Sequence, residues 1–347
     1  MCFGHDGDEA LARSLEARGA SRRGLIRGAA GATAGVAALG ALGASPASAA
    51  GRGRGHGHGG GHGGGHGGHG GGRALDLDTI SIQLYTLRSA AAAPGTGAAA
   101  IGHPAVLEAL ARYGYGRVEL AGLYGETPAG MRALLDALGL RATSSHDGIS
   151  ADTGAAHAKF QGAVTLGQRY VNVPYLASTA LADWQRWADQ MNAEAAIARK
   201  YGLRYGYHNH AHEFTTDLGG GLTPWEVLMD RLDPRLVHLE VDLYWAFTGG
   251  VNTGHTTAES ALQFAKDVID EAPLQVRQYH VKDRTSMGTA PAEADMCDLG
   301  VGVIDFASLF RHYQVEEYIV ENDTPDNPAA PLLTAAVGRL HLEHLRF

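Results

Sequence analysis

The chain has 347 residues, of which 45% are hydrophobic and 19% are charged, enough to bury a large core in one barrel domain without a second full domain. The formal net charge is −9. An acidic surface repels phosphodiester backbones, so nucleic acid is excluded as an expected partner.

The first 49 residues have the pattern of an export signal. Arg22 and Arg23 precede a stretch rich in Ala, Gly and Leu, and Ala47-Ser48-Ala49 offers a small-residue cleavage site. This order resembles a twin-arginine signal, although a weak membrane anchor or a chance pair of arginines would share parts of it. Because the stretch is too rich in Gly and Ala for a permanent span, we expect a protein exported by the twin-arginine pathway to the periplasm, the cell surface or the medium. No stable membrane insertion is expected after the signal is removed.

Residues 50–76 are predicted to be a disordered linker. The tract from Gly51 to Gly72 consists almost entirely of Gly and His, which cannot bury apolar area. Such tracts also capture divalent transition metals. Cys2 would leave with the signal, and Cys297 alone cannot form an intramolecular disulfide. The folded domain is therefore expected over residues 77–347.

From residue 77 onward the sequence repeats one unit, an apolar run followed by a helical stretch that ends in Gly. Apolar residues recur at a helical period, as in Trp184, Trp187 and Met191 before Gly202. Alternation of strands and helices produces parallel crossovers, and eight units favour a single closed α/β domain, the (β/α)8 TIM barrel. An open doubly wound sheet is the alternative, but no phosphate-binding glycine loop follows the first run. The expected strands are Ile80–Leu84, Arg117–Leu120, Arg141–Ser145, Tyr170–Val173, Arg204–Tyr207, Val237–Val241, Val276–His280 and Glu317–Val320.

Residues that can bind a metal ion end or directly follow four of these strands. They are His208, Asp242, His280 and Glu321, and the intervals between them are 34, 38 and 41 residues. A parallel barrel gathers the carboxyl ends of its strands at one mouth, so these side chains are expected to converge on one divalent ion. One such residue alone is more often a helix cap than a ligand. The prediction therefore rests on all four, with His210 or Glu213 as substitutes for His208.

Several motifs resemble the sugar phosphate isomerase/epimerase family of the xylose isomerase-like barrels, over roughly residues 79 to 345. That superfamily also includes inosose dehydratases, ketose 3-epimerases and endonuclease IV, so the resemblance implies the scaffold without the substrate. The motifs are Ile80-Ser81-Ile82-Gln83-Leu84-Tyr85, Val118-Glu119-Leu120-Ala121-Gly122, Tyr207-His208-Asn209-His210 with Glu213-Phe214, His280-Val281-Lys282-Asp283 and Gly300-Val301-Gly302-Val303-Ile304-Asp305.

The resemblance implies a metal site with Glu, Asp, His and Glu at the ends of the last four strands. Asp242, His280 and Glu321 match the last three positions. His208 departs from the pattern, because ketose epimerases have Glu there, and the next carboxylate in this chain is Glu213. Since those epimerases use two metal-bound Glu residues on opposite faces of the sugar, His208 removes one member of that pair.

Three further residues are expected at the same mouth. His146 follows the third strand where relatives often keep a substrate-facing or metal-binding His, and Glu119 on the second strand is expected to point to the same mouth. Lys282 should point to the same side as His280, because side chains alternate along a strand. Its ammonium could hold a substrate oxygen, or instead pair with Asp283. Aromatic residues that could stack on sugar rings near the strand ends are Tyr85, Tyr175, Tyr244 and Trp245.

The chemistry expected from this site is proton abstraction beside a metal-polarised carbonyl. One divalent ion, Mn, Co, Zn, Fe or Mg, would be held by His208, Asp242, His280 and Glu321, with Glu321 as the base. His146, Glu213 or Lys282 could return the proton or protonate a leaving group. We therefore favour a metal-dependent sugar isomerase or epimerase acting on a small-molecule carbohydrate. A lyase or dehydratase of keto-glycosides or inososes is the nearer alternative, and a non-catalytic exported sugar-binding protein the other. The substrate, the metal and the oligomeric state, homo-oligomer included, are left open by the sequence.

Overall fold

A computed structural model describes residues 72–288, 295–325 and 330–347 of the chain. The predicted export signal and residues 50–71 of the predicted linker lie outside the described residues. Among the described residues, no helix combines the length and the apolar character that crossing a bilayer requires.

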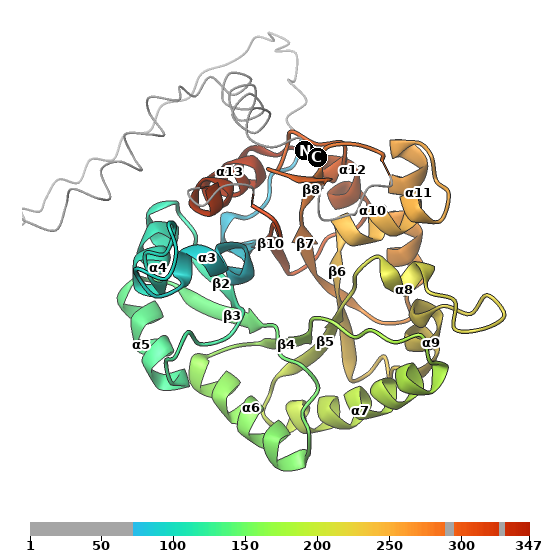
Figure 1. The fold of residues 1–347 in the computed structure, drawn as a ribbon, viewed down its shortest axis with the longest axis horizontal. Helices are drawn as coiled ribbons and strands as arrows, with labels where there is room; N and C mark the ends of the chain where they lie inside the picture. Colours follow the sequence, from blue (N-terminus) through green and yellow to red (C-terminus); the bar gives the residue numbers. More distant parts are fainter. Residues whose placement is uncertain (1–71, 289–294, 326–329) are drawn as a thin grey trace, which may run out of the picture.

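The strands form the predicted closed barrel (Figure 1). Six strands pair in the order β1-β10-β7-β6-β5-β4, β2 pairs with β3, and all of these pairs are parallel. Single backbone bridges from Gln83 to Glu119 and from His146 to Asn172 connect the two groups of strands. The strands are β1 Ile80–Ile82, β2 Arg117–Leu120, β3 Arg141–Ser145, β4 Tyr170–Val173, β5 Arg204–His208, β6 Val237–Asp242, β7 Val276–Val281 and β10 Glu317–Val320.

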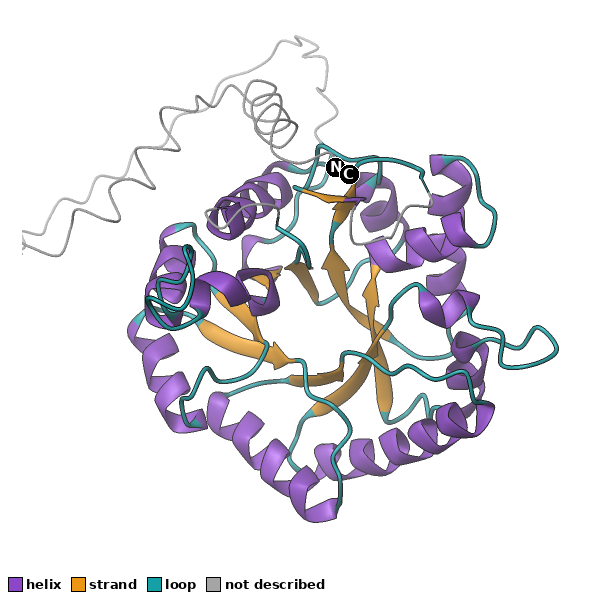
Figure 2. Cartoon of the chain, viewed as in Figure 1, coloured by secondary structure: helices purple, strands orange, loops and turns teal. Residues whose placement is uncertain are grey.

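Helices surround the strands as an outer layer (Figure 2). Gly114, Gly139 and Gly202 follow three of them with φ values of 86°, 70° and 75°, which confirms their predicted role at helix ends. The longer helices are α4 His103–Arg112, α5 Pro128–Ala137, α6 Thr153–Leu166, α7 Leu181–Lys200, α9 Pro224–Arg231, α10 Leu243–Asn252, α11 Ala258–Asp270, α12 Phe306–His312 and α13 Ala330–His344. The short ones are η1 Leu77–Thr79, η2 Leu84–Leu87, α3 Arg88–Ala91 and α8 His212–Thr215.

A small antiparallel ribbon at the mouth was not predicted. It pairs β8 Asp283–Arg284 with β9 Met296–Cys297 between β7 and α12. The buried carboxylate of Asp283 anchors the segment that follows, because it accepts hydrogen bonds from the backbone N–H groups of Gly300, Gly302 and Ile304. Strands of two residues carry no periodic signal, so the sequence could not reveal this ribbon.

The interior of the barrel is polar rather than filled with aliphatic side chains. Asn172 on β4 donates from Nδ2 to Glu240 on β6 at 2.6 Å and to Gln278 on β7 at 3.0 Å, so these buried groups meet across the barrel. Gly206 on β5 leaves room for them, because a Cβ atom there would overlap Asn172 and the ring of His238. The interior network therefore depends on a residue without a side chain.

We expect Gly206→Ala to lower the free energy of unfolding by about 1–3 kcal/mol, the usual cost of overpacking a filled core. Urea denaturation monitored by circular dichroism would measure it. Gly116→Ala is the matched control, because a Cβ at Gly116 meets no atom within 4 Å and no positive φ opposes it. Equal midpoints for the two variants would contradict the packing argument.

Candidate metal and active site

The ends of β5, β6, β7 and β10 bring four predicted residues together. Asp242 pairs in register with His280, His208 pairs with Glu240, and Glu321 directly follows β10. One potential ligand atom from each of His208, Asp242, His280 and Glu321 lies within 4.8 Å of the others, and all four side chains are buried. The site therefore has the composition that the strand spacing indicated.

Each of the two imidazoles turns one nitrogen to this group and the other to a deeper carboxylate. His280 Nδ1 lies 2.6 Å from Glu321 Oε2, whereas its Nε2 lies 2.6 Å from Glu119 Oε2. His208 Nε2 lies 3.6 Å from Asp242 Oδ2, and its Nδ1 lies 3.3 Å from Glu240 Oε1. Metal-binding histidines commonly donate their second ring N–H to a carboxylate, which fixes the tautomer. Glu119 and Glu240 are placed to do this.

Besides Asp323, which contacts Lys282, the sequence analysis missed Glu240. It lies on β6 between His238 and Asp242, so all three share one side of the strand and point into the barrel. Its Oε1 lies 2.8 Å from His146 Nε2 and 3.2 Å from His280 Nε2. A second group of potential metal ligands, formed by His146, His208, Glu240 and His280, overlaps the first. The sequence His238-Leu239-Glu240-Val241-Asp242 could have indicated that Glu240 belongs to the site, because polar and apolar residues alternate in it and the three polar ones therefore share one side of the strand.

The electrostatics favour the metal-binding forms of His208 and Glu321. Burial lowers the pKa of His208 to about 3, so its imidazole is neutral and keeps a lone pair. Burial alone would raise the pKa of Glu321, but the Lys282 ammonium and His280 hold it well below its usual range. Glu321 is therefore an ionised carboxylate at neutral pH. Burial raises the pKa of Asp242, while Lys282 opposes that rise. Burial would lower the pKa of His280, but the carboxylates of Glu240, Glu119 and Glu321 raise it well above its usual value, so a metal ion would have to displace a proton there.

These residues fit a divalent transition metal. Two neutral or neutralisable imidazoles and two carboxylates match the donor preferences of Zn, Mn, Fe or Co, with Mg also accommodated. Metal bonds of about 2.1 Å place ligand atoms roughly 3–4 Å apart, close to the observed spacing. Asp242 Oδ2 also accepts no hydrogen bond of ordinary geometry, although Lys282 Nζ is 3.0 Å away. The four candidate ligands therefore lie close together, and the Asp242 oxygen that faces the other three still lacks a hydrogen-bond donor of ordinary geometry.

Lys282 lies at the mouth of the barrel, as predicted, but it does not form the ion pair with Asp283 that was the predicted alternative to a substrate contact. Its Nζ lies 2.7 Å from Glu321 Oε2, 2.9 Å from Asp323 Oδ2 and 3.0 Å from Asp242 Oδ2. A pair with Asp283 is wrong, because successive residues of a strand point to opposite sides and Asp283 binds backbone N–H groups instead. Burial would lower the pKa of Lys282, but these carboxylates raise it well above its usual value.

His146 reaches the site and Glu213 does not. The ring of His146 stacks on that of His280 with centroids 5.1 Å apart, and His146 lines the pocket above the four ligands. Glu213 is buried on α8, where it accepts hydrogen bonds from the Tyr207 hydroxyl and the His210 backbone N–H. Glu213 therefore stays outside both groups of potential ligands among the described residues.

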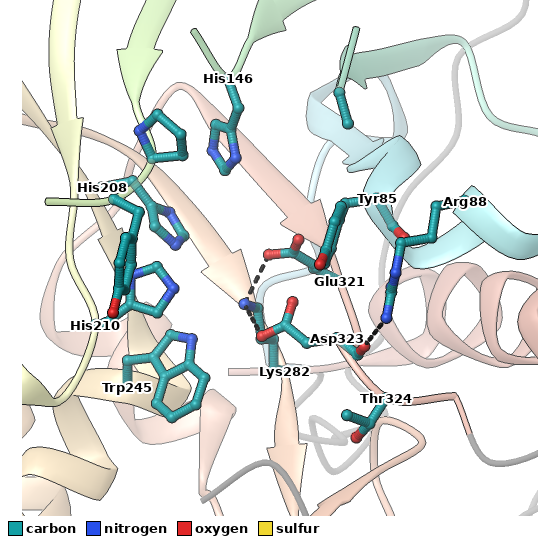
Figure 3. A pocket seen from close by; sticks show the side chains of 13 residues that line it. Tyr85, Arg88, His146, His208, His210, Trp245, Lys282, Glu321, Asp323 and Thr324 are labelled. Atoms are coloured by element: carbon teal, nitrogen blue, oxygen red, sulfur yellow. Dashed lines mark hydrogen bonds and ion pairs between the residues drawn. The ribbon is translucent and has the colours of Figure 1, made fainter. Parts of the chain in front are cut away.

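A pocket of about 600 Å³ opens above the candidate metal site (Figure 3). Glu321 and Lys282 lie at its floor, and His210 and Trp245 stand beside each other on one wall, with ring centroids 5.2 Å apart. Tyr85 and Tyr175 also line it, whereas Tyr244 packs against Trp245 outside the lining. A cavity of this size holds a small polyhydroxylated molecule.

Glu317, at the far end of the barrel interior, gives stability a pH dependence. Burial raises its pKa from 4.5 to about 7. The folded state then binds more protons than the unfolded state between these values, so stability falls by about 3 kcal/mol as pH rises through this window. We expect Glu317→Gln to remove this fall. Urea denaturation at pH 5 and pH 8 would measure it, and parallel pH profiles for variant and wild type would contradict the assignment.

A family model described as "Xylose isomerase-like TIM barrel" matches residues 107–329. The barrel and the site at its mouth define the same class, and the match covers more than half of the chain. The chain therefore belongs to the xylose isomerase-like TIM barrel family.

Two curated relatives are both named inosose dehydratase. The protein from Bacillus licheniformis is 27% identical over an alignment of 168 residues, and the match covers 46% of this chain and 54% of that protein. The chain thus spans about half the length of this relative. The protein from Geobacillus kaustophilus is 25% identical over an alignment of 282 residues, and the match covers 69% of this chain and 86% of that protein.

Solved structures share the fold at lower identity. A sugar phosphate isomerase/epimerase from Parabacteroides distasonis has a TM-score of 0.57 and 20% identity, with 78% of this chain and 95% of that chain covered. The IolI protein with a bound zinc atom has a TM-score of 0.55 and 14% identity, with 78% and 99% covered. These similarities support the barrel architecture.

Proposed function

We propose that this protein is a metal-dependent lyase or dehydratase that removes a proton beside the carbonyl of a keto-sugar, keto-glycoside or keto-cyclitol and expels an oxygen substituent one carbon further on. The observation that carries the proposal is the buried Glu321 carboxylate, held between Lys282 and His280 at the floor of an open pocket. The two relatives named inosose dehydratase lend it support.

The residues divide the work between binding and proton transfer. His208, Asp242, His280 and Glu321 would hold the ion. A bound divalent cation would polarise the substrate carbonyl and make the neighbouring C–H more acidic. Glu321 then accepts that proton, since it is ionised and lines the pocket. In a β-elimination, the C–H electrons form the new C=C bond, and the departing oxygen takes a proton from Lys282 or His146, which also line the pocket.

Isomerisation or epimerisation is the second candidate, and the position of His146 favours it. His146 comes from the segment after β3 and Glu321 from the segment after β10, so they approach the pocket from different strands of the barrel. If His146 returns a proton to the carbon chain, the product is an isomer or epimer instead of an unsaturated ketone. Both outcomes begin with the same abstraction by Glu321.

One experiment separates these outcomes. The purified protein with Mn, Co or Zn would be incubated in deuterated water with 2-keto-myo-inositol, a 3-keto-glucoside and a ketohexose, and followed by NMR. We expect loss of water or of the glycosidic substituent. Solvent deuterium retained at a carbon of an intact sugar would instead support the isomerase or epimerase. If none of the compounds changes with any of the metals, the proposed enzymatic function is wrong, and a non-catalytic sugar-binding protein is the hypothesis that remains.

A further inference from the structure

The mouth of the pocket is bordered by two exposed aromatic rings. Tyr85 is 44% exposed and Tyr175 is 56% exposed. The other large apolar residues that are exposed in the described part of the chain are the aliphatic residues Leu77, Ile101, Val164 and Leu222, and none of them lines this pocket. Exposed aromatic side chains gathered at one opening mark a binding surface.

The two rings stand on different parts of the barrel wall. Tyr85 follows β1, and Tyr175 follows β4, which is the other end of the six-stranded part of the sheet. Tyr175 packs edge-on against His210 with centroids 5.1 Å apart, so it extends the wall formed by His210 and Trp245. Tyr85 stands on the opposite wall, beside Arg88 (Figure 3). The two rings therefore line the same pocket from different strands of the barrel.

Tyr85 is held in place by the guanidinium group of Arg88. Arg88 lies over the ring, with Cζ 4.0 Å from its centroid. The guanidinium is fixed by hydrogen bonds from Nη1 to the Tyr85 carbonyl at 2.8 Å and from Nη2 to the Asp323 carbonyl at 2.6 Å. Because the ring is ordered before a ligand arrives, stacking on it costs little conformational entropy.

The pocket therefore has two levels of different chemistry. Its floor carries buried, charged groups such as Glu321 and Lys282, and its opening carries half-exposed aromatic rings. A volume of about 600 Å³ holds about twenty water-sized groups at about 30 Å³ each, which is more than one hexose ring requires. A free monosaccharide bound at the floor would leave the aromatic opening unused.

We propose that the opening is a subsite for the leaving group of a glycoside, so that the substrates are keto-glycosides with a ring-shaped aglycone or second sugar rather than free keto-sugars. The ring with the carbonyl binds at the floor, and the second ring stacks between Tyr85 and Tyr175. The assignment of the second ring as a leaving group rests on the proposed function, because only an elimination would expel it. The stacking subsite itself is a binding property and is tested without catalysis.

The test compares two unreactive ligands that lack the carbonyl, 4-nitrophenyl β-D-glucoside and methyl β-D-glucoside. Isothermal titration calorimetry on the full-length protein would give both dissociation constants. Two stacking contacts predict that the aryl glucoside binds about tenfold more tightly. The ratio should fall about threefold in Tyr85→Ala or Tyr175→Ala and approach one in the double variant, since the contacts are lost in turn.

Three controls separate stacking from general damage. Tyr85→Phe and Tyr175→Phe keep the rings and should keep the ratio, and Tyr201→Ala removes a ring outside the pocket and should leave it unchanged. Equal affinities for the two glucosides in the wild type, a ratio that survives the double substitution, or no binding of either glucoside would each overturn the subsite. If the ratio behaves as expected but no keto-glycoside reacts, the subsite stands and the proposed elimination fails.

Discussion

Glu321→Gln is expected to abolish exchange of the substrate's acidic proton with solvent while leaving a folded protein that still binds the ion. The amide cannot accept the proton, but its oxygen can still coordinate and can still accept a hydrogen bond from Lys282, 2.7 Å away in the wild type. General-base catalysis contributes about 10²–10⁴ in rate, so a loss of at least that size is expected. Deuterium incorporation into a 3-keto-glucoside, followed by NMR, is the measurement.

Glu317→Gln is the matched control for this experiment. Glu317 is also a buried carboxylate on β10, but it contacts Thr143 and Gln278 inside the barrel and does not line the pocket. The same chemical change at the start of the strand that Glu321 directly follows should therefore leave proton exchange intact. Full exchange activity in Glu321→Gln would show that the base is another group, with His146 the next candidate.

Asp242→Asn is expected to weaken binding of the divalent ion by about 100-fold or more, because it removes one of two anionic ligands from a buried site. Competition against a chelator, with metal content checked by elemental analysis, would measure this. Deleting residues 51–72 in both proteins removes any weak binding by the Gly/His tract. The deletion alone should leave the tight site unchanged.

The control for Asp242→Asn must account for a second role of this residue. Asp242 Oδ1 accepts the backbone N–H of Trp245 at 2.8 Å and so caps α10. Asp305 caps α12 in the same way through the N–H of Ser308. Asp305→Asn therefore reproduces the change at a helix start away from the pocket, and it should not alter metal binding. A similar loss of affinity in both variants would mean that Asp242 acts through helix structure alone.

The sequence predicted most of the strands because their buried apolar residues alternate with the polar residues of the barrel interior, and helical stretches separate one strand from the next. β2, β3, β4 and β10 begin and end as expected, and β5, β6 and β7 each extend one residue beyond the prediction. The predicted end of β1 is wrong, because that strand stops at Ile82 and η2 begins at Leu84. The ends of such strands are also where barrels place their sites. Local pattern and global topology therefore pointed to the same four residues.

The remaining features depend on distances that a sequence does not contain. Asp323 lies two residues after Glu321, but only the closed barrel brings its carboxylate within 2.9 Å of Lys282. Glu240 could be assigned to the interior side of its strand, yet its contacts with His146 and His280 come from two other strands. Nothing local distinguishes an interior carboxylate that supports ligands from one that binds an ion.

The helix cap at Asp242 ties the metal site to the wall of the pocket. One carboxylate oxygen belongs to the first turn of α10 and the other to the candidate ligand group, so movement of this side chain also moves the start of the helix. Trp245 stands in that turn, with Lys282 Nζ 5.6 Å from its ring. An arriving cation would change the charge beside this indole, and the emission of Trp245 would therefore serve as a built-in optical signal of site occupancy.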